Sequence, residues 1–246
     1  MKRLLLLSNS TNHGAGYLDH AIDAIVSFLG PVRRPVFVPF ALRDQQAYAA
    51  KARDRLAAVG IDVQAVTADA AGAAALEEAA AVFVGGGNTF RLLDRLQRSG
   101  LLEVLKRRAA AGMPYLGASA GTNIAAPTIK TTNDMPIVQP ASFSALGLVP
   151  FQINPHYIDA DPASRHMGET REERLREYLE ENETPVLALR EGAWLRVEGD
   201  RARLEGAKGA RIFRRDAEPE EVAPGAALDH LLSGALGSRP RAPRER

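Results

Sequence analysis

The sequence contains no cysteine. Disulfide bonds, zinc sites built on thiolates and a cysteine nucleophile are therefore excluded, and a cytoplasmic location is expected. The sequence also lacks an excess of charge of one sign, since 31 Lys and Arg residues stand against 30 Asp and Glu residues. Proteins that bind nucleic acid through bulk charge usually have a clear basic excess, so we expect no nucleic-acid partner.

Long apolar runs are missing as well. No run approaches the roughly 18 residues of a membrane-spanning helix, so we expect no membrane association. The apolar run Leu4–Leu7 follows two basic residues, but it is too short for a signal sequence and ends at Ser8. We expect it to form a buried strand. The 246 residues, 46% of them hydrophobic, suffice for one globular core that buries roughly 70–75% of the unfolded surface.

Short apolar runs alternate with helical stretches along the chain. The pattern predicts strands at Leu4–Ser8, Pro35–Phe40, Ile61–Thr67, Ala81–Gly85 and Pro114–Leu116, and helices at Gln45–Val59, Ala73–Ala80 and, interrupted at Ser99–Gly100, from Phe90 toward Gly112. Shorter strands are expected at Val186–Leu189, Trp194–Val197 and Arg201–Leu204. Strands that alternate with helices imply an α/β fold, with a mostly parallel sheet covered by helices on both faces.

The C-terminal region changes in composition. From about Asp216 onward Pro, Gly, Ala and Arg accumulate, and residues 233–246 hold four Arg and one Glu. We therefore expect a single α/β domain over residues 1–232, followed by a disordered Arg- and Pro-rich tail at 233–246.

The segment Gly117–Gly121 (GASAG) follows a predicted strand and precedes a plausible helix start. This is the context of a nucleophile elbow, a turn so tight that we expect side chains at the two glycine positions to collide with the serine. Ser119 would then lie at the carboxyl edge of the sheet, and the N–H of Ala120 would point to where an oxyanion forms. The alternative is a glycine-rich turn that contains a serine by chance.

A second glycine-rich segment, Gly85–Thr89, also lies between a strand and a helix. Free N–H groups there can bind an anion or a nucleotide phosphate. Alternatively, the loop caps the helix through Asn88 or Thr89. A phosphate-binding P-loop is less favoured, because the Gly-Lys-Ser/Thr ending is absent.

A nucleophilic serine needs a base and a carboxylate that orients the base. Among five histidines, His156 follows a strand-like run and is the best placed. Asp134, in a loop after the elbow, and Glu191, after the strand Val186–Leu189, are the carboxylate candidates, although either can be a turn residue or a surface charge. No His-Glu-x-x-His motif supports a metal site.

Several segments together resemble the peptidase E family of serine aspartyl dipeptidases, which also contains cyanophycinases. They are LLLLSNST, VGGGNTF, GASAG, PTIKTTNDMPIV, QINPH and GETREER, and the resemblance extends almost from end to end, fading after about Phe213. It implies a three-layer α/β/α sandwich related to class I glutamine amidotransferases. It also implies hydrolysis of dipeptides with an N-terminal aspartate, without metal or cofactor, by a monomer or homodimer.

The resemblance also implies residue roles. Ser119 matches the nucleophile and His156 the base, and both Asp134 and Glu191 match acids proposed as the third member. Gly87 and Ala120 would supply the oxyanion N–H groups. Ala118 and Thr122 depart from the family pattern, with a bulkier aromatic and a smaller residue expected there. The amidotransferase relatives carry an acid two residues after the histidine, where this sequence has Ile158.

Arg171 is the last candidate. Thr170 and Glu173 predict a capping box at a helix start, which places Arg171 in the first turn. The helix dipole disfavours a cation there, and Arg171 shares the inward stripe of Leu175 and Leu179. Its anionic partner is either a nearby glutamate or, as the resemblance implies, the side-chain carboxylate of a substrate aspartate.

The sequence thus predicts a serine exopeptidase that cleaves Asp-Xaa dipeptides through an acyl-enzyme. The alternatives are a cyanophycinase-like hydrolase of β-aspartyl-arginine bonds and, from another class, a non-catalytic module that binds an anion or nucleotide at Gly85–Asn88.

Overall fold

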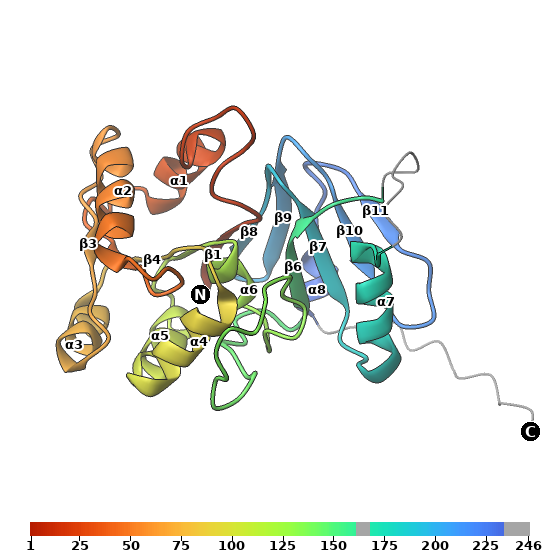
Figure 1. Ribbon diagram of the computed structural model, residues 1–246. Helices are drawn as coiled ribbons and strands as arrows, with labels where there is room; N and C mark the ends of the chain where they lie inside the picture. The colour runs from red at the N-terminus through yellow and green to blue at the C-terminus, as the bar shows by residue number, and fades with distance from the viewer. Residues whose placement is uncertain (161–167, 234–246) are drawn as a thin grey trace, which may run out of the picture.

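The computed structural model describes residues 1–160 and 168–233, which form a mixed α/β fold with two sheets (Figure 1). The larger sheet has the order β3 (Gln64–Ala65), β2 (Val36–Val38), β4 (Val82–Val84), β5 (Tyr115–Ala118), β1 (Arg3–Leu7), β8 (Ala193–Glu198) and β9 (Arg201–Gly206). Its strands from β3 to β1 are parallel, whereas β8 and β9 are antiparallel to their neighbours. The expected parallel strand at Leu4–Ser8 is confirmed.

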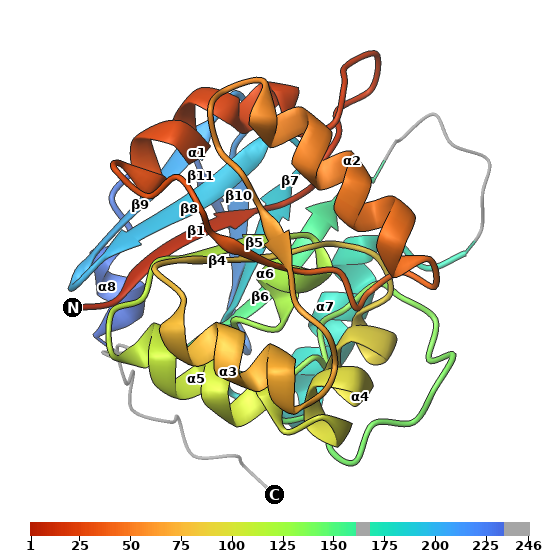
Figure 2. The same cartoon turned by 90° about the vertical axis from the view of Figure 1, so that its left-hand side faces the viewer.

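Helices cover both faces of the parallel part of this sheet (Figure 2). On one face, α1 (Ile22–Leu29), preceded by the 3₁₀ turn η1 (Asp19–Ala21), and α2 (Gln45–Ala57) pack on Leu5 and Leu7. On the other face, α3 (Ala70–Glu78), α4 (Thr89–Arg98) and α5 (Leu101–Ala110) pack with Leu4 and Leu6. Since successive strand residues point to opposite faces, the uninterrupted leucine run of β1 serves both cores.

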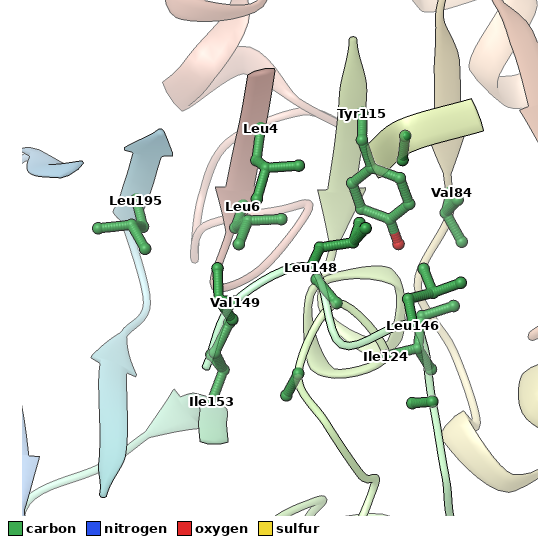
Figure 3. Close-up of a cluster of buried hydrophobic side chains, with 14 of the residues drawn as sticks. Leu4, Leu6, Val84, Tyr115, Ile124, Leu146, Leu148, Val149, Ile153 and Leu195 are labelled. Atoms are coloured by element: carbon green, nitrogen blue, oxygen red, sulfur yellow. The ribbon is translucent and has the colours of Figure 1, made fainter. Parts of the chain in front are cut away.

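The segment between α6 (Ala120–Asn123) and β6 (Gln152–Tyr157) contains no further helix or strand, yet it fills the core. Figure 3 shows Leu146, Leu148 and Val149 from this segment beneath Leu4, Leu6 and Tyr115 of the large sheet. The packing therefore joins the large sheet to the next part of the chain.

A second sheet has the order β11 (Glu220–Val222), β10 (Ala210–Phe213), β7 (Val186–Arg190) and β6. Only the pair β6–β7 is parallel. One face joins the main core through residues such as Ile153, and α7 (Arg171–Glu181) covers the other through Leu175 and Leu179. The last described helix is α8 (Asp229–Leu232).

The expectation of one sheet was wrong in this respect. Strands β7 and β8 are separated by two residues only, Glu191 and Gly192, yet they belong to different sheets. Gly192 has a φ of +86°, a left-handed conformation that glycine adopts at little cost, and the chain changes sheets there. Apolar periodicity predicts a strand but not its partner.

Other expectations differ in extent. The strand predicted at Ile61–Thr67 is reduced to the two residues of β3, whereas α1, β10, β11 and α8 were not predicted. The expected disordered tail lies, except for Ser233, outside the described residues. Among the residues that the structure describes, no helix is long and apolar enough to cross a membrane.

Candidate active site

The turn between β5 and α6 has the geometry of a nucleophile elbow. Ser119 has φ 54° and ψ −110°, a strained conformation that places it at the carboxyl end of β5. A Cβ atom on Gly121 would lie 2.1 Å from the carbonyl oxygen of Val84, and one on Gly117 would lie 2.6 Å from that of Gly121. The atoms nearest to such side chains thus belong to Gly121, Thr122 and Val84, whereas the sequence led us to expect the serine.

His156 lies in the second sheet and faces this serine. Its Nε2 atom is 2.8 Å from Ser119 Oγ. The register of β6 against β7 shifts between Asn154 and Tyr157, and His156 itself has a positive φ of 55°. An irregularity of this kind redirects a side chain, and strained non-glycine residues concentrate at functional sites.

Glu191 is the carboxylate that contacts the histidine. Its Oε1 atom lies 2.6 Å from His156 Nδ1, so Ser119, His156 and Glu191 form one chain of hydrogen bonds. The Glu191 side chain is 46% exposed and the His156 side chain 37%. The site is therefore open to solvent. It lies at the junction of the two sheets, because Glu191 belongs to the link between β7 and β8.

Asp134 has other partners. Its Oδ2 atom accepts hydrogen bonds from the Thr89 N–H at 2.7 Å and the Thr89 hydroxyl at 2.6 Å. A carboxylate at this position stabilises the N-terminus of α4. Asn88 caps the same helix by accepting from the Arg91 N–H, as the capping alternative predicted.

The glycine-rich loop before α4 borders Ser119. A Cβ atom on Gly86 would lie 2.9 Å from the Cβ of Ser119. The N–H groups of Gly85, Gly86 and Asn88 donate to Val38 O, the Tyr48 hydroxyl and Ala41 O. Within residues 1–160 and 168–233, no acceptor takes a hydrogen bond from the N–H of Gly87 or of Ala120.

Arg171 is the first residue of α7, behind a complete capping box of Thr170 and Glu173, as predicted. It is half-buried, and over the described part of the chain its guanidinium has no ion pair or hydrogen bond to a side chain. Burial lowers the pKa of Arg171, the positive charge of Arg174 lowers it further, and Asp134 opposes both. Among the residues that the structure describes, Arg171 is thus a cation without a full counter-charge.

Of the two residues that depart from the family pattern, Thr122 is fully buried and its hydroxyl donates to Leu7 O at 2.6 Å, while Ala118 is buried in the core beside α2. Sequence reasoning missed Tyr48, which holds Gly86, and also Ser8 and Asn9, both fully buried at the end of β1. The sequence signal that could have identified Ser8 and Asn9 is their position: two polar residues directly after a buried apolar strand. Of the other histidines, His166 lies outside the described residues.

Residues 4–205 match the model of peptidase family S51, and the chain belongs to this family of peptidases. It is 62% identical to peptidase E of Streptomyces coelicolor over 229 residues, which cover 93% of this chain and 94% of the relative. It is 48% identical to a probable alpha-aspartyl dipeptidase of Drosophila melanogaster, over 94% of this chain and 98% of that protein.

Two solved structures share the fold. A putative peptidase E protein from Listeria monocytogenes matches with a TM-score of 0.65 and 23% identity, over 85% of this chain and all of that one. A peptidase from an acI-B1 actinobacterium matches with a TM-score of 0.69 and 15% identity, over 93% and 96% of the two chains. At these identities the likeness concerns the fold.

Proposed function

We propose that this protein is a serine-type dipeptidase that hydrolyses dipeptides with an N-terminal aspartate. The observation that carries the proposal is the chain of hydrogen bonds from Ser119 through His156 to Glu191. The substrate class is taken from the Drosophila relative, whose name specifies an alpha-aspartyl dipeptidase. Membership of peptidase family S51 agrees with peptide hydrolysis at this site.

In the proposed reaction, Ser119 Oγ attacks the carbonyl carbon of the aspartyl residue while His156 Nε2 accepts the hydroxyl proton. The N–H groups of Gly87 and Ala120 stabilise the oxyanion. The tetrahedral intermediate collapses, the C–N bond breaks, and His156 returns the proton to the departing amine. A water molecule, deprotonated by His156, then attacks the aspartyl ester of Ser119. The C–Oγ bond breaks, His156 returns the proton to Ser119 Oγ, and aspartate is released.

Glu191 is the proposed third member of the triad. Its bond to Nδ1 keeps the proton on that nitrogen, so Nε2 is free to accept the serine proton, and its charge stabilises the imidazolium that forms. Asp134, the other candidate, is assigned the support of the α4 N-terminus, because its hydrogen bonds go to Thr89.

Arg171 is the proposed binding group for the substrate aspartate. A guanidinium binds a carboxylate through two parallel hydrogen bonds, a geometry that lysine does not reproduce. The support is the missing counter-charge of Arg171 among the described residues and its pKa, lowered first by burial. An uncharged side chain in the substrate would leave Arg171 unpaired, which accounts for selection of aspartate over asparagine.

The two alternatives are not favoured. The relatives reported above are named peptidase E or alpha-aspartyl dipeptidase, not cyanophycinase. An anion-binding module at Gly85–Asn88 conflicts with the geometry, since the carboxylate of Asp134 already binds the N-terminus of α4. We further propose a three-layer α/β/α core related to class I glutamine amidotransferases, a cytoplasmic location, and a monomer or homodimer that binds no nucleic acid. Helices on both faces of the parallel strands support the fold assignment.

The test is a panel of Asp-Xaa, β-Asp-Xaa, Asn-Xaa and Glu-Xaa dipeptides, combined with intact-mass detection of an acyl-enzyme. We expect turnover of the α-linked Asp-Xaa peptides and an aspartyl adduct on Ser119. Ser119→Ala should lose about 10⁴–10⁶-fold in rate and keep its melting temperature. Near-normal turnover by folded Ser119→Ala would overturn the serine mechanism, and a preference for β-linked Asp-Arg would favour the cyanophycinase-like alternative.

A further inference from the structure

Three consecutive residues at the end of β1 each contact the backbone beside one member of the proposed triad. The first is Leu7, whose carbonyl oxygen accepts the Ser119 N–H at 3.0 Å and the Thr122 hydroxyl at 2.6 Å. Both donors belong to the nucleophile elbow. The carbonyl group of Leu7 therefore binds the elbow at two points, Ser119 and, three residues later, Thr122 in α6.

Ser8 makes the second contact. Its hydroxyl donates to Leu189 O at 2.8 Å and accepts the His156 N–H at 2.9 Å. The side chain is fully buried, so neither bond competes with water. It accepts from the very residue that has φ 55° in a strand, a conformation that needs local support.

Asn9 makes the third contact. Its Oδ1 atom accepts the Gly192 N–H at 2.9 Å, directly after Glu191. Its Nδ2 atom donates to Thr11 O and to Asn12 Oδ1, which fixes the orientation of the amide. Asn9 is also fully buried, and Gly192 is the residue at which the chain changes sheets.

From these contacts we infer that Ser8 and Asn9 are positioning residues, which align His156 and Glu191 of the second sheet with Ser119 of the large sheet. The inference rests on the proposed function, because it presupposes that the triad reacts. Neither residue touches the reacting atoms. Their role follows from geometry: the triad spans two sheets, and the Leu7–Asn9 segment is bonded to the elbow, to His156 and to the β7–β8 link at once.

Ser8→Ala is the decisive variant. Since a displacement of about 1 Å at a reacting group costs up to 10²-fold in rate, kcat should fall about 10- to 100-fold with KM within about twofold of wild type. Ser8→Thr retains the hydroxyl and should recover most of kcat, even though the added methyl group lowers the melting temperature.

The matched control is Thr131→Val. Thr131 is buried, and its hydroxyl donates to Ile153 O at 2.9 Å. Ile153 lies in β6, three residues before His156. Thr131→Val should destabilise the protein to a similar degree without a comparable loss of kcat. An equal loss of kcat in Thr131→Val and Ser8→Ala would mean that Ser8 acts only through stability, and the inference would be overturned.

A double-mutant cycle with Glu191→Gln adds a readout that a structural role would not move. Ser8 and Glu191 both act through the orientation of His156, so Ser8→Ala should lower kcat only about twofold or less in the Glu191→Gln background. Thr131→Val should have the same effect in both backgrounds. If Ser8→Ala does not fold, Asn9→Ala replaces it in the same cycle. Additive effects on kcat would overturn the inference.

The outcomes separate the two proposals. If Ser119→Ala and Glu191→Gln keep full activity, the proposed function itself is wrong. If both lose activity and Ser8→Ala retains the kcat of wild type, the function stands and the positioning role is refuted.

Discussion

Glu191 and Asp134 are equally good candidates for the triad carboxylate from the sequence, but their contacts differ: Glu191 binds His156 and Asp134 binds Thr89. Glu191→Gln should lower kcat/KM about 10²–10⁴-fold, because the amide no longer holds the imidazole in the productive tautomer. Asp134→Asn should cost less than about tenfold and lower the melting temperature instead, since it weakens the N-terminus of α4. Steady-state kinetics and thermal denaturation of both variants provide the measurement. The reverse ranking of the two rate losses would make Asp134 the triad acid.

Arg171 and Arg174 allow a matched comparison on one helix. Arg174 is exposed and pairs with Glu169, whereas Arg171 has no such pair among the described residues. Arg171→Met should weaken transition-state binding of Asp-Xaa peptides by about 2–5 kcal/mol, as for other broken desolvated charge pairs, with stability close to wild type. Arg174→Met should leave kcat/KM unchanged. A variant Arg171→Met that still prefers Asp-Xaa over Asn-Xaa would refute the assignment.

Among the elements, the β5–α6 elbow leaves no space for a side chain at Gly121. Gly121→Ala should destabilise the protein by about 3 kcal/mol or more, because the new methyl group meets the carbonyl of Val84, a backbone atom that cannot yield. Gly60→Ala is the comparison: Gly60 has a positive φ, +75°, which disfavours alanine, but open space surrounds it, so only about 1 kcal/mol is expected. Urea denaturation measures both. Equal losses would show that the contact with Val84 costs no more than the strained backbone of Gly60, and would contradict the steric argument at position 121.

The elements that were predicted and those that were missed differ for physical reasons. Helix α2 and the interruption between α4 and α5 at Gly100 follow from local signals, and the structure confirms them. Strand β10 (ARIF) and strand β11 (EEV) are short and partly charged, so their pairing in the second sheet depends on distant partners. For the same reason, the sequence singled out Ser119 and His156, which the structure brings within 2.8 Å of each other, but it left two acids open. Neither spacing nor periodicity encodes which carboxylate reaches the imidazole.

For the whole molecule, stability should depend on pH through His20. Burial lowers the pKa of His20, more than the nearby charges of Asp19 and Glu191 raise it. The unfolded chain therefore binds this proton more readily, and stability falls as the pH drops below roughly 6.5 until the folded histidine also titrates. We therefore expect the melting temperature of wild type to fall more than that of His20→Phe when the pH is lowered from 8 to 5. A constant difference would contradict this.

The extent of the folded unit is also testable. We expect removal of residues 233–246 to leave activity and melting temperature unchanged, because the composition of this tail is typical of disorder. Removal of residues 227–246 should lower the melting temperature, since it deletes α8, whose Asp229 accepts the Ala202 N–H and whose Leu231 is buried. A marked destabilisation by the shorter deletion would show that the tail contacts the body.

The order in which the chain visits its two sheets bears on its synthesis. From β5 the chain leaves the large sheet for β6 and β7, returns for β8 and β9, and leaves again for β10 and β11. Strand β1 emerges from the ribosome almost 200 residues before its partner β8. The strands of the two sheets alternate along the chain, so each sheet contains strands from separate stretches of the sequence. We therefore expect the proposed triad of Ser119, His156 and Glu191 to align only after the chain has been made beyond β8.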